Sequence, residues 1–146
     1  MNSSTEESWS CEYAVETSAS PEAIWRLFSD VPGWKNWNPG VERIEIHGPF
    51  AAGTTFEMTP PGQETITSVL VEVREPVLFV DETRVDNLVV RVAHRIEPMP
   101  SGRNRVVYAV EAAGPGCSEI GPMVSSDFPE VLKGLAALAE SEQTHR

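Results

Sequence analysis

Six strand-like segments follow one another between residues 41 and 113, and only short links separate them. Each is rich in Val, Ile and Thr, and glycine, proline or Asn/Asp residues stand between neighbours, as is typical of strands joined by turns. A parallel crossover needs a dozen or more residues, so the links predict antiparallel neighbours. The predicted strands are residues 41–48, 53–59, 64–75, 77–85, 87–97 and 104–113.

Residues 9–17 add a seventh strand at the start of the chain. Trp9, Cys11, Tyr13 and Val15 alternate there with mostly polar residues, which indicates a half-buried strand. The stretch that follows, SPEAIWRLFSD, predicts a helix because Ser20 suits the N-cap and Pro21 the first helical position.

The C-terminal segment carries apolar residues every three to four positions from Ile120 to Leu138, which predicts a helix from about residue 118 onward. Pro122 and Pro129 predict an irregularity in its first half. The broad apolar stripe must be covered, and the sheet is the only large partner. The pattern therefore predicts an α+β fold in which a curved seven-stranded antiparallel sheet encloses a long C-terminal helix. Incomplete closure at one end would leave a cavity lined by the inward strand faces.

Chain length and composition limit the number of domains and the kinds of partner that the protein can bind. The chain has 146 residues, which predicts one domain over residues 9–141 between a disordered tail at 1–8 and a frayed end at 142–146. It has no long apolar run and no signal-peptide pattern, so we expect a cytoplasmic protein without membrane segments. A net charge of −11 argues against nucleic-acid and membrane-surface binding. Cys11 and Cys117 stand alone and are interpreted as buried small hydrophobes.

Several motifs together resemble a known family: SPEAIWRLFSDVPGWKNWNPG, GTTF, the pair VLVEV and LFVDE, AHRIEP, NRVVYAV and DFPEVLKGLAALAE. Over about residues 9–141 the chain resembles the polyketide cyclase/dehydrase-like branch of the START-like (Bet v 1-like, SRPBCC) superfamily. The resemblance implies a helix-grip fold with two short helices after the first strand and a hydrophobic cavity between sheet and helix. Members bind lipids, hormones or aromatic polyketides, and some cyclise or dehydrate poly-β-ketones without a metal or organic cofactor. We therefore expect no cofactor and no metal.

The segment WKNWN places Trp34 and Trp37 among turn residues, and it matches the family motif before the second strand. Two interpretations stay open. In the first, both indoles pack under the short helices and close one end of the sheet. In the second, one indole belongs to the pocket rim, and Trp34 is the better candidate of the two. Asn38, before Pro39, is interpreted as a turn residue.

Two inward-facing polar side chains are the candidate chemical groups. Alternation places His94 with Val90, Val92 and Ile96, and Tyr108 with Val106 and Val110. Each is either a hydrogen-bonded core residue or a cavity group; a cavity-facing histidine could anchor a ligand or exchange protons.

Four charged residues, Glu82, Arg84, Asp127 and Glu57, give weaker indications of a site. In 77–85 we expect Leu78 and Val80 to face inward, on the same side as Glu82 and Arg84. An inward Glu82–Arg84 pair would mark a site, but the preferred interpretation is that this end of the strand has left the core. Asp127 either faces the cavity mouth or caps a helix, and Glu57 is assigned to solvent. The sequence contains no nucleophile elbow, phosphate-binding loop or metal-ligand motif.

We therefore predict a protein that binds a small hydrophobic or aromatic molecule between sheet and helix. The alternative is a cofactor-independent cyclase or dehydratase, with His94 as general acid/base and Tyr108 stabilising an enolate oxygen. A monomer and a homodimer are both compatible with the pattern. The predicted lining residues are Trp34, Phe56, Met58, Val80, Val92, His94, Tyr108, Met123 and Phe128.

Overall fold

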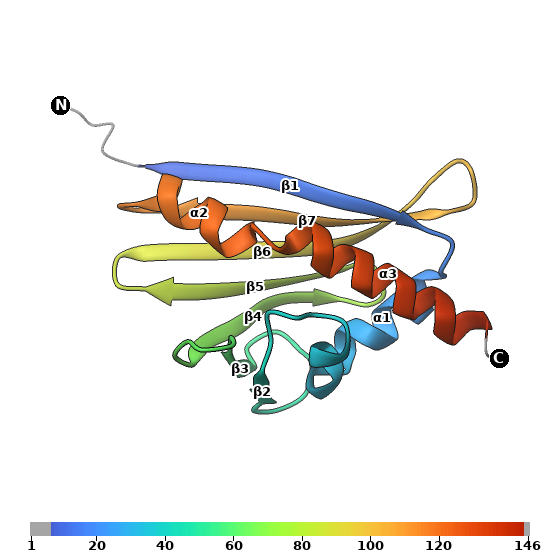
Figure 1. The fold of residues 1–146 in the computed structure, drawn as a ribbon, viewed down its shortest axis with the longest axis horizontal. Helices are drawn as coiled ribbons and strands as arrows, with labels where there is room; N and C mark the ends of the chain where they lie inside the picture. Colours follow the sequence, from blue (N-terminus) through green and yellow to red (C-terminus); the bar gives the residue numbers. More distant parts are fainter. Residues whose placement is uncertain (1–6, 145–146) are drawn as a thin grey trace.

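The computed structural model describes residues 7–144 and contains the predicted strands and helices (Figure 1). A short 3-10 helix, η1, includes part of residues 34–38, which we call the tryptophan segment. Helices α1 and η1 are therefore the two short helices expected after the first strand. The elements are β1 (Ser8–Thr17), α1 (Pro21–Ser29), η1 (Val31–Asn36), β2 (Arg43–Ile46), β3 (Thr55–Thr59), β4 (Ile66–Arg74), β5 (Leu78–Val85), β6 (Leu88–Pro98), β7 (Asn104–Ala113), α2 (Cys117–Ser125) and α3 (Phe128–Thr144).

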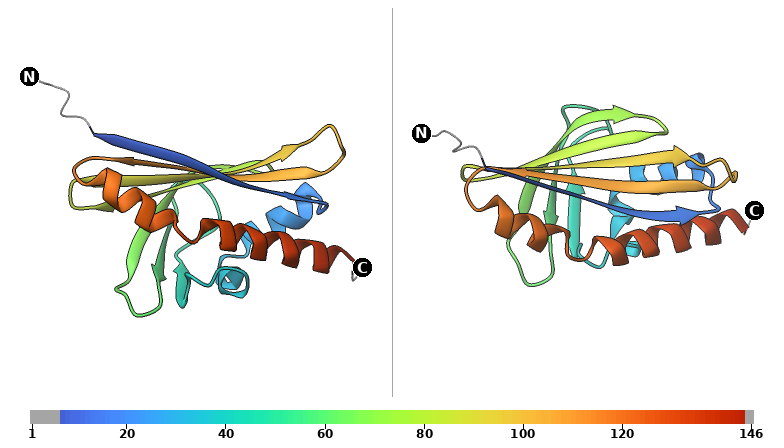
Figure 2. Two further views of the ribbon diagram at one scale, coloured as in Figure 1. Left: turned by 45° about the horizontal axis from the view of Figure 1, so that its top comes forward. Right: turned by 90° about the horizontal axis from the view of Figure 1, so that it is seen from above.

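The seven strands form one antiparallel sheet in the order β1-β7-β6-β5-β4-β3-β2. A register shift between Leu70 and Glu72 marks an irregularity in β4, and such bulges increase strand bending and twist. The sheet curves around the C-terminal helices, which cross its inner face (Figure 2). The predicted seven-stranded helix-grip architecture is confirmed.

The C-terminal helical region is interrupted at Ser126 and Asp127, between α2 and α3, as its prolines predict. The interior side of α3 is formed by Val131, Leu132, Leu135 and Ala139, each at most 1% exposed. Helix α3 continues to Thr144, into the region expected to fray, and residues 145–146 lie outside the described residues. The expected N-terminal tail also lies mostly outside them, and β1 begins at Ser8. No helix within residues 7–144 is both long and apolar enough to cross a bilayer.

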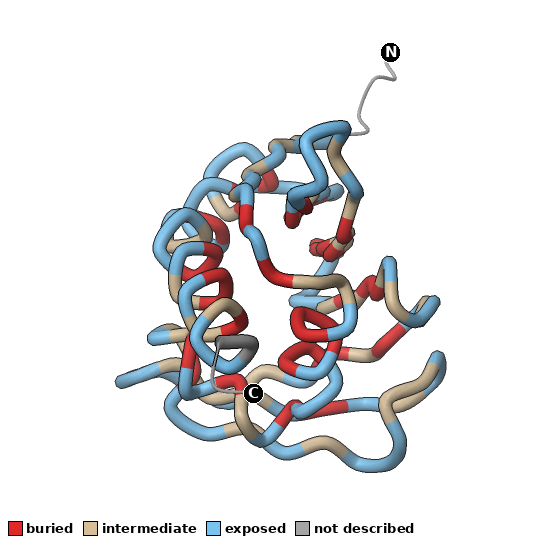
Figure 3. Tube along the Cα trace, turned by 90° about the vertical axis from the view of Figure 1, so that its right-hand side faces the viewer, coloured by how far each residue is buried: buried red, intermediate tan, exposed pale blue. Residues whose placement is uncertain are grey.

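Aromatic residues fill the centre of the molecule. Phe28 and Phe79 are at most 1% exposed and pack edge to face, with ring centroids 5.0 Å apart. Trp25 contacts both rings. In Figure 3 the buried segments of the strands and helices turn toward one another, and the exposed segments lie outside. The N-cap of α1 is confirmed, because the Ser20 hydroxyl accepts a hydrogen bond from the Ala23 amide at 3.1 Å.

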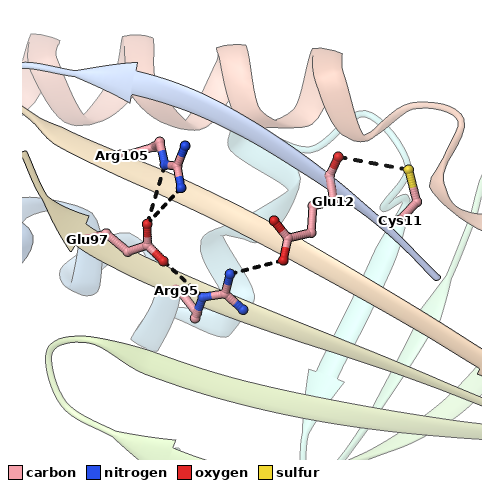
Figure 4. A network of polar contacts seen from close by, with 5 residues as sticks. All are labelled: Cys11, Glu12, Arg95, Glu97 and Arg105. Carbon is pink, nitrogen blue, oxygen red and sulfur yellow. Dashed lines mark hydrogen bonds and ion pairs between the residues drawn. The ribbon is translucent and has the colours of Figure 1, made fainter.

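Charged residues pair on the outer face of the sheet (Figure 4). Arg95 bridges Glu12 and Glu97, with nitrogen–oxygen distances of 3.3 and 3.1 Å, and Arg105 contacts Glu97 at 3.0 Å. Cys11, half-buried beside Glu12, is a free thiol. The interpretation as a buried small side chain fits Cys117, which is 1% exposed, more closely than Cys11.

The predicted orientation of β5 is wrong, and Val80 is corrected with it. Val80 lies on the outer face, beside Ala93 and Arg95. Glu82 shares this face and is nearly buried because Arg84 and Arg91 cover it, at 2.9 and 2.6 Å. The pair therefore does not mark an interior site. Both faces of β5 start with apolar residues, so alternation cannot distinguish them; the larger ring of Phe79 occupies the core instead.

Candidate functional site

A cavity of about 850 Å³ lies between the inner face of the sheet, the tryptophan segment and the α2–α3 region. Its walls are mainly apolar and aromatic. Of the nine predicted lining residues only Val80 is missing; those present are Trp34, Phe56, Met58, Val92, His94, Tyr108, Met123 and Phe128. Met123 is 70% exposed, so it lies at the mouth, whereas Tyr108 is 3% exposed and lies deep.

His94 occupies β6 directly opposite Phe79 on β5 and Tyr108 on β7. Its Nδ1 lies 3.2 Å from the backbone oxygen of Phe79. A carbonyl oxygen only accepts hydrogen bonds, so Nδ1 carries the proton and Nε2 of the neutral ring is an acceptor. Burial lowers the pKa of His94 to about 3, so the ring is neutral at physiological pH.

Asp81 extends the polar region, and sequence reasoning missed it. Its Oδ2 lies 4.0 Å from His94 Nε2, and its side chain is 14% exposed. Burial raises the pKa of Asp81 to about 7, because removal from water disfavours the charged carboxylate. Near neutral pH this carboxyl group is therefore divided between its protonated and ionised forms.

Tyr108 completes the group. Its ring meets His94 edge to face, with centroids 4.5 Å apart. Burial, and then the nearby Asp81 carboxylate, raise the pKa of Tyr108 above its usual range, so the phenol keeps its proton. Within residues 7–144 no hydrogen bond of its hydroxyl to another side chain or to the backbone is found. The structure thus brings His94 and Tyr108 together and adds Asp81 from the adjacent strand.

Trp34 and Trp37, the two indoles of residues 34–38, are core residues that also line the cavity. They are 5% and 6% exposed, respectively. Trp34 Nε1 donates a hydrogen bond to the Phe28 carbonyl oxygen at 2.9 Å. Trp37 Nε1 is the one fully buried side-chain nitrogen or oxygen without a partner in the described part of the chain. Asn38 is a turn residue as predicted, since its Oδ1 accepts from the Gly40 amide at 2.8 Å.

Other residues reach the cavity without having been predicted there. Phe79 and Asp81 follow from the reversed orientation of β5, and Asp86 lies in the turn after it. Asp127 also lines the cavity, which agrees with the first of its two interpretations. No pattern in the sequence distinguishes these aspartates from solvated ones, and the orientation of β5 accounts only for Asp81.

Three side chains with metal-ligand atoms lie close together on the exposed surface. Glu45, His47 and Glu57 each offer a ligand atom, and these atoms lie within 4.8 Å of one another. Glu57 faces solvent as predicted, with a side chain 46% exposed, and its oxygen lies 3.5 Å from His47 Nε2. Exposed acidic groups of this kind are common, and this one is no part of the cavity.

The fold and the cavity define a helix-grip protein. A model of the family described as polyketide cyclase / dehydrase and lipid transport matches residues 8–140, so the chain belongs to that family. No curated protein matches its sequence.

Solved structures share the fold at low sequence identity. Norcoclaurine synthase from Thalictrum flavum, in complex with dopamine and hydroxybenzaldehyde, is 16% identical with a TM-score of 0.76, over 94% of this chain and 90% of that one. The di-domain ARO/CYC StfQ from the steffimycin biosynthetic pathway is 16% identical with a TM-score of 0.77, over 94% of this chain and 52% of that one. Ara h 8.0201 is 14% identical with a TM-score of 0.72, over 92% and 99%.

Proposed function

We propose that the protein binds a small hydrophobic or aromatic molecule in the cavity, with the ligand's polar end toward Asp81, His94 and Tyr108. The observation that carries this proposal is the combination of a mainly apolar cavity of about 850 Å³ with Asp81, His94 and Tyr108 on three neighbouring strands of its wall. Ligand sites typically have volumes of about 300–1,000 Å³, largely apolar walls and few polar groups.

Burial of the apolar body supplies the affinity. At roughly 25 cal/mol per Å², about 300 Å² of apolar ligand surface removed from water contributes roughly 7.5 kcal/mol before the entropic costs of association. The polar groups then orient the ligand, because a buried polar end without a partner would be costly.

Native mass spectrometry of the protein purified from its own host tests the proposal, with a denatured sample as control. We expect a small lipophilic mass that leaves on denaturation. A bare protein that also fails to gain thermal stability from a panel of polyketide-like and fatty ligands would refute the proposal.

A second candidate function is a cofactor-independent cyclase or dehydratase. The observation that favours it is the pKa of Asp81, about 7, since a general base is most effective near the working pH. His94, with a pKa of about 3, is a weak base, so the acid–base role passes from His94 to Asp81.

The chemical step would be enolisation. The Asp81 carboxylate would take a proton from a carbon between two carbonyl groups. The C–H electron pair would form the C=C bond of the enolate, and the carbonyl π electrons would move to the oxygen, which accepts a hydrogen bond from Tyr108. Deuterium exchange at that carbon of a bound β-diketone tests this function. Exchange no faster in the wild type than in Asp81→Asn would exclude it.

A further inference from the structure

We propose that the cavity selects a hydrophobic amine, whose ammonium group lies among Asp81, His94 and Tyr108, and that it rejects a carboxylate of the same shape. This specificity rests on the proposed ligand binding and names the class of ligand.

Three groups that can accept a hydrogen bond lie on the neighbouring strands β5, β6 and β7 of the cavity wall. His94 Nε2 is an acceptor because Nδ1 uses the ring's only proton on the Phe79 carbonyl. The ionised Asp81 carboxylate, 4.0 Å from that nitrogen, only accepts. The Tyr108 oxygen, on a residue 3% exposed, can accept as well and has no protein partner within residues 7–144. An ammonium group has three N–H donors for these three acceptors.

The charged residues that line the cavity also favour a cationic ligand over an anionic one. Asp81, Asp86 and Asp127 line the cavity, and the lining contains neither lysine nor arginine among the described residues. A ligand carboxylate would therefore be buried without a cation and close to Asp81, and both conditions oppose binding. An ammonium group would instead give Asp81 the counter-charge that its site lacks.

The aromatic residues of the cavity wall and the net charge of the protein also favour a cationic ligand. Trp34 and Phe56 also line the cavity, and aromatic side chains can bind cations over their ring faces. The net charge of −11 raises the local concentration of cationic molecules and lowers that of anions.

Competition against a neutral fluorescent probe, Nile red, tests the selectivity with ligands of one shape: naphthylethylamine, naphthylethanol and naphthylacetate. At pH 8 we expect the amine to bind about tenfold tighter than the alcohol, the ratio that one charge-assisted hydrogen bond supplies, and the acid to bind most weakly. The titratable groups lining the cavity are Asp81, Asp86, His94, Tyr108 and Asp127. Because Asp81 ionises near pH 7, the amine's advantage should fall between pH 8 and pH 5.5.

Asp81→Asn should remove the amine's advantage while Nile red still binds. Glu57→Gln, which removes an exposed carboxyl outside the cavity, is the matched control and should behave as the wild type. If Asp81→Asn does not fold, the relative affinities of the three ligands for the wild type, and their pH dependence, still test the preference for the amine. Binding of Nile red with no preference for the amine would overturn the inference and leave ligand binding intact. If neither Nile red nor any ligand of the series binds, the inference falls together with the proposed function.

Discussion

The imidazole of His94 lies flat on the phenyl ring of Phe79, with centroids 3.9 Å apart and planes 7° from parallel. The two residues are cross-strand partners of β6 and β5, and the His94 ring also donates to the Phe79 backbone oxygen. One residue therefore sets both the position and the tautomer of the histidine. His94 Nε2 is left for the cavity as an acceptor.

His94 should remain neutral throughout the physiological range. We expect nitrogen-detected NMR to show the Nδ1-protonated tautomer and no protonation above about pH 4, because burial lowers the pKa of His94 to about 3. Titration of His94 near pH 6.5 would contradict the buried, hydrogen-bonded arrangement.

Asp81→Asn should change how stability depends on pH. Burial raises the pKa of Asp81 from 3.8 to about 7, so its proton stabilises the folded state below about pH 4, and this contribution is lost as the pH rises through 7. The total change is about 4 kcal/mol, an order-of-magnitude figure from 1.36 kcal/mol per pKa unit.

The free energy of unfolding of Asp81→Asn, measured in urea relative to the wild type, should therefore increase between pH 4 and pH 7. The lowered pKa of His94 acts in both proteins and largely cancels in the difference. A difference that does not vary with pH would show that Asp81 is solvated.

Trp34→Phe should cost more stability than Trp37→Phe. Both replacements remove a similar volume from buried positions, but only Trp34 Nε1 donates a hydrogen bond, to the Phe28 carbonyl. We expect an additional loss of about 1 kcal/mol for Trp34→Phe in urea unfolding, the usual net value of one hydrogen bond. Equal losses would mean that this bond contributes nothing measurable.

Gly134→Ala should destabilise the protein although alanine favours helices. A Cβ atom at position 134 would lie 2.7 Å from the Trp37 carbonyl oxygen, so α3 and the tryptophan segment would have to separate. We expect a loss of about 1–3 kcal/mol, as in other overpacked interiors. Ala137→Gly, at an exposed position of α3, is the control for helix propensity and should cost about 1 kcal/mol. A stabilised Gly134→Ala would contradict the close packing.

Much of this architecture could be predicted from the sequence, because short links, alternation and the C-terminal apolar stripe each restrict the chain strongly. The inward placement of His94 and Tyr108 followed from alternation, since their strands have one clearly apolar face. In β5 both faces begin with apolar residues, and the prediction chose the wrong one.

The reversed orientation of β5 explains why the sequence did not predict Asp81 as a cavity residue. Asp81 becomes an interior residue only when Phe79 faces inward, and the choice depends on how large rings pack across the sheet rather than on local pattern. The covering of Glu82 by Arg84 and Arg91, which makes the outward orientation favourable, is likewise a contact across strands.

A fluorescence titration of Nile red with three proteins tests whether the cavity between the sheet and the helices is the binding site. Val92→Phe fills the cavity, and Val71→Phe makes the same replacement on the outer face. We predict one saturable site in the wild type and in Val71→Phe, and binding weakened at least about tenfold in Val92→Phe, because the added ring occupies ligand space. Equal binding by all three folded proteins, or none by the wild type, would contradict the account.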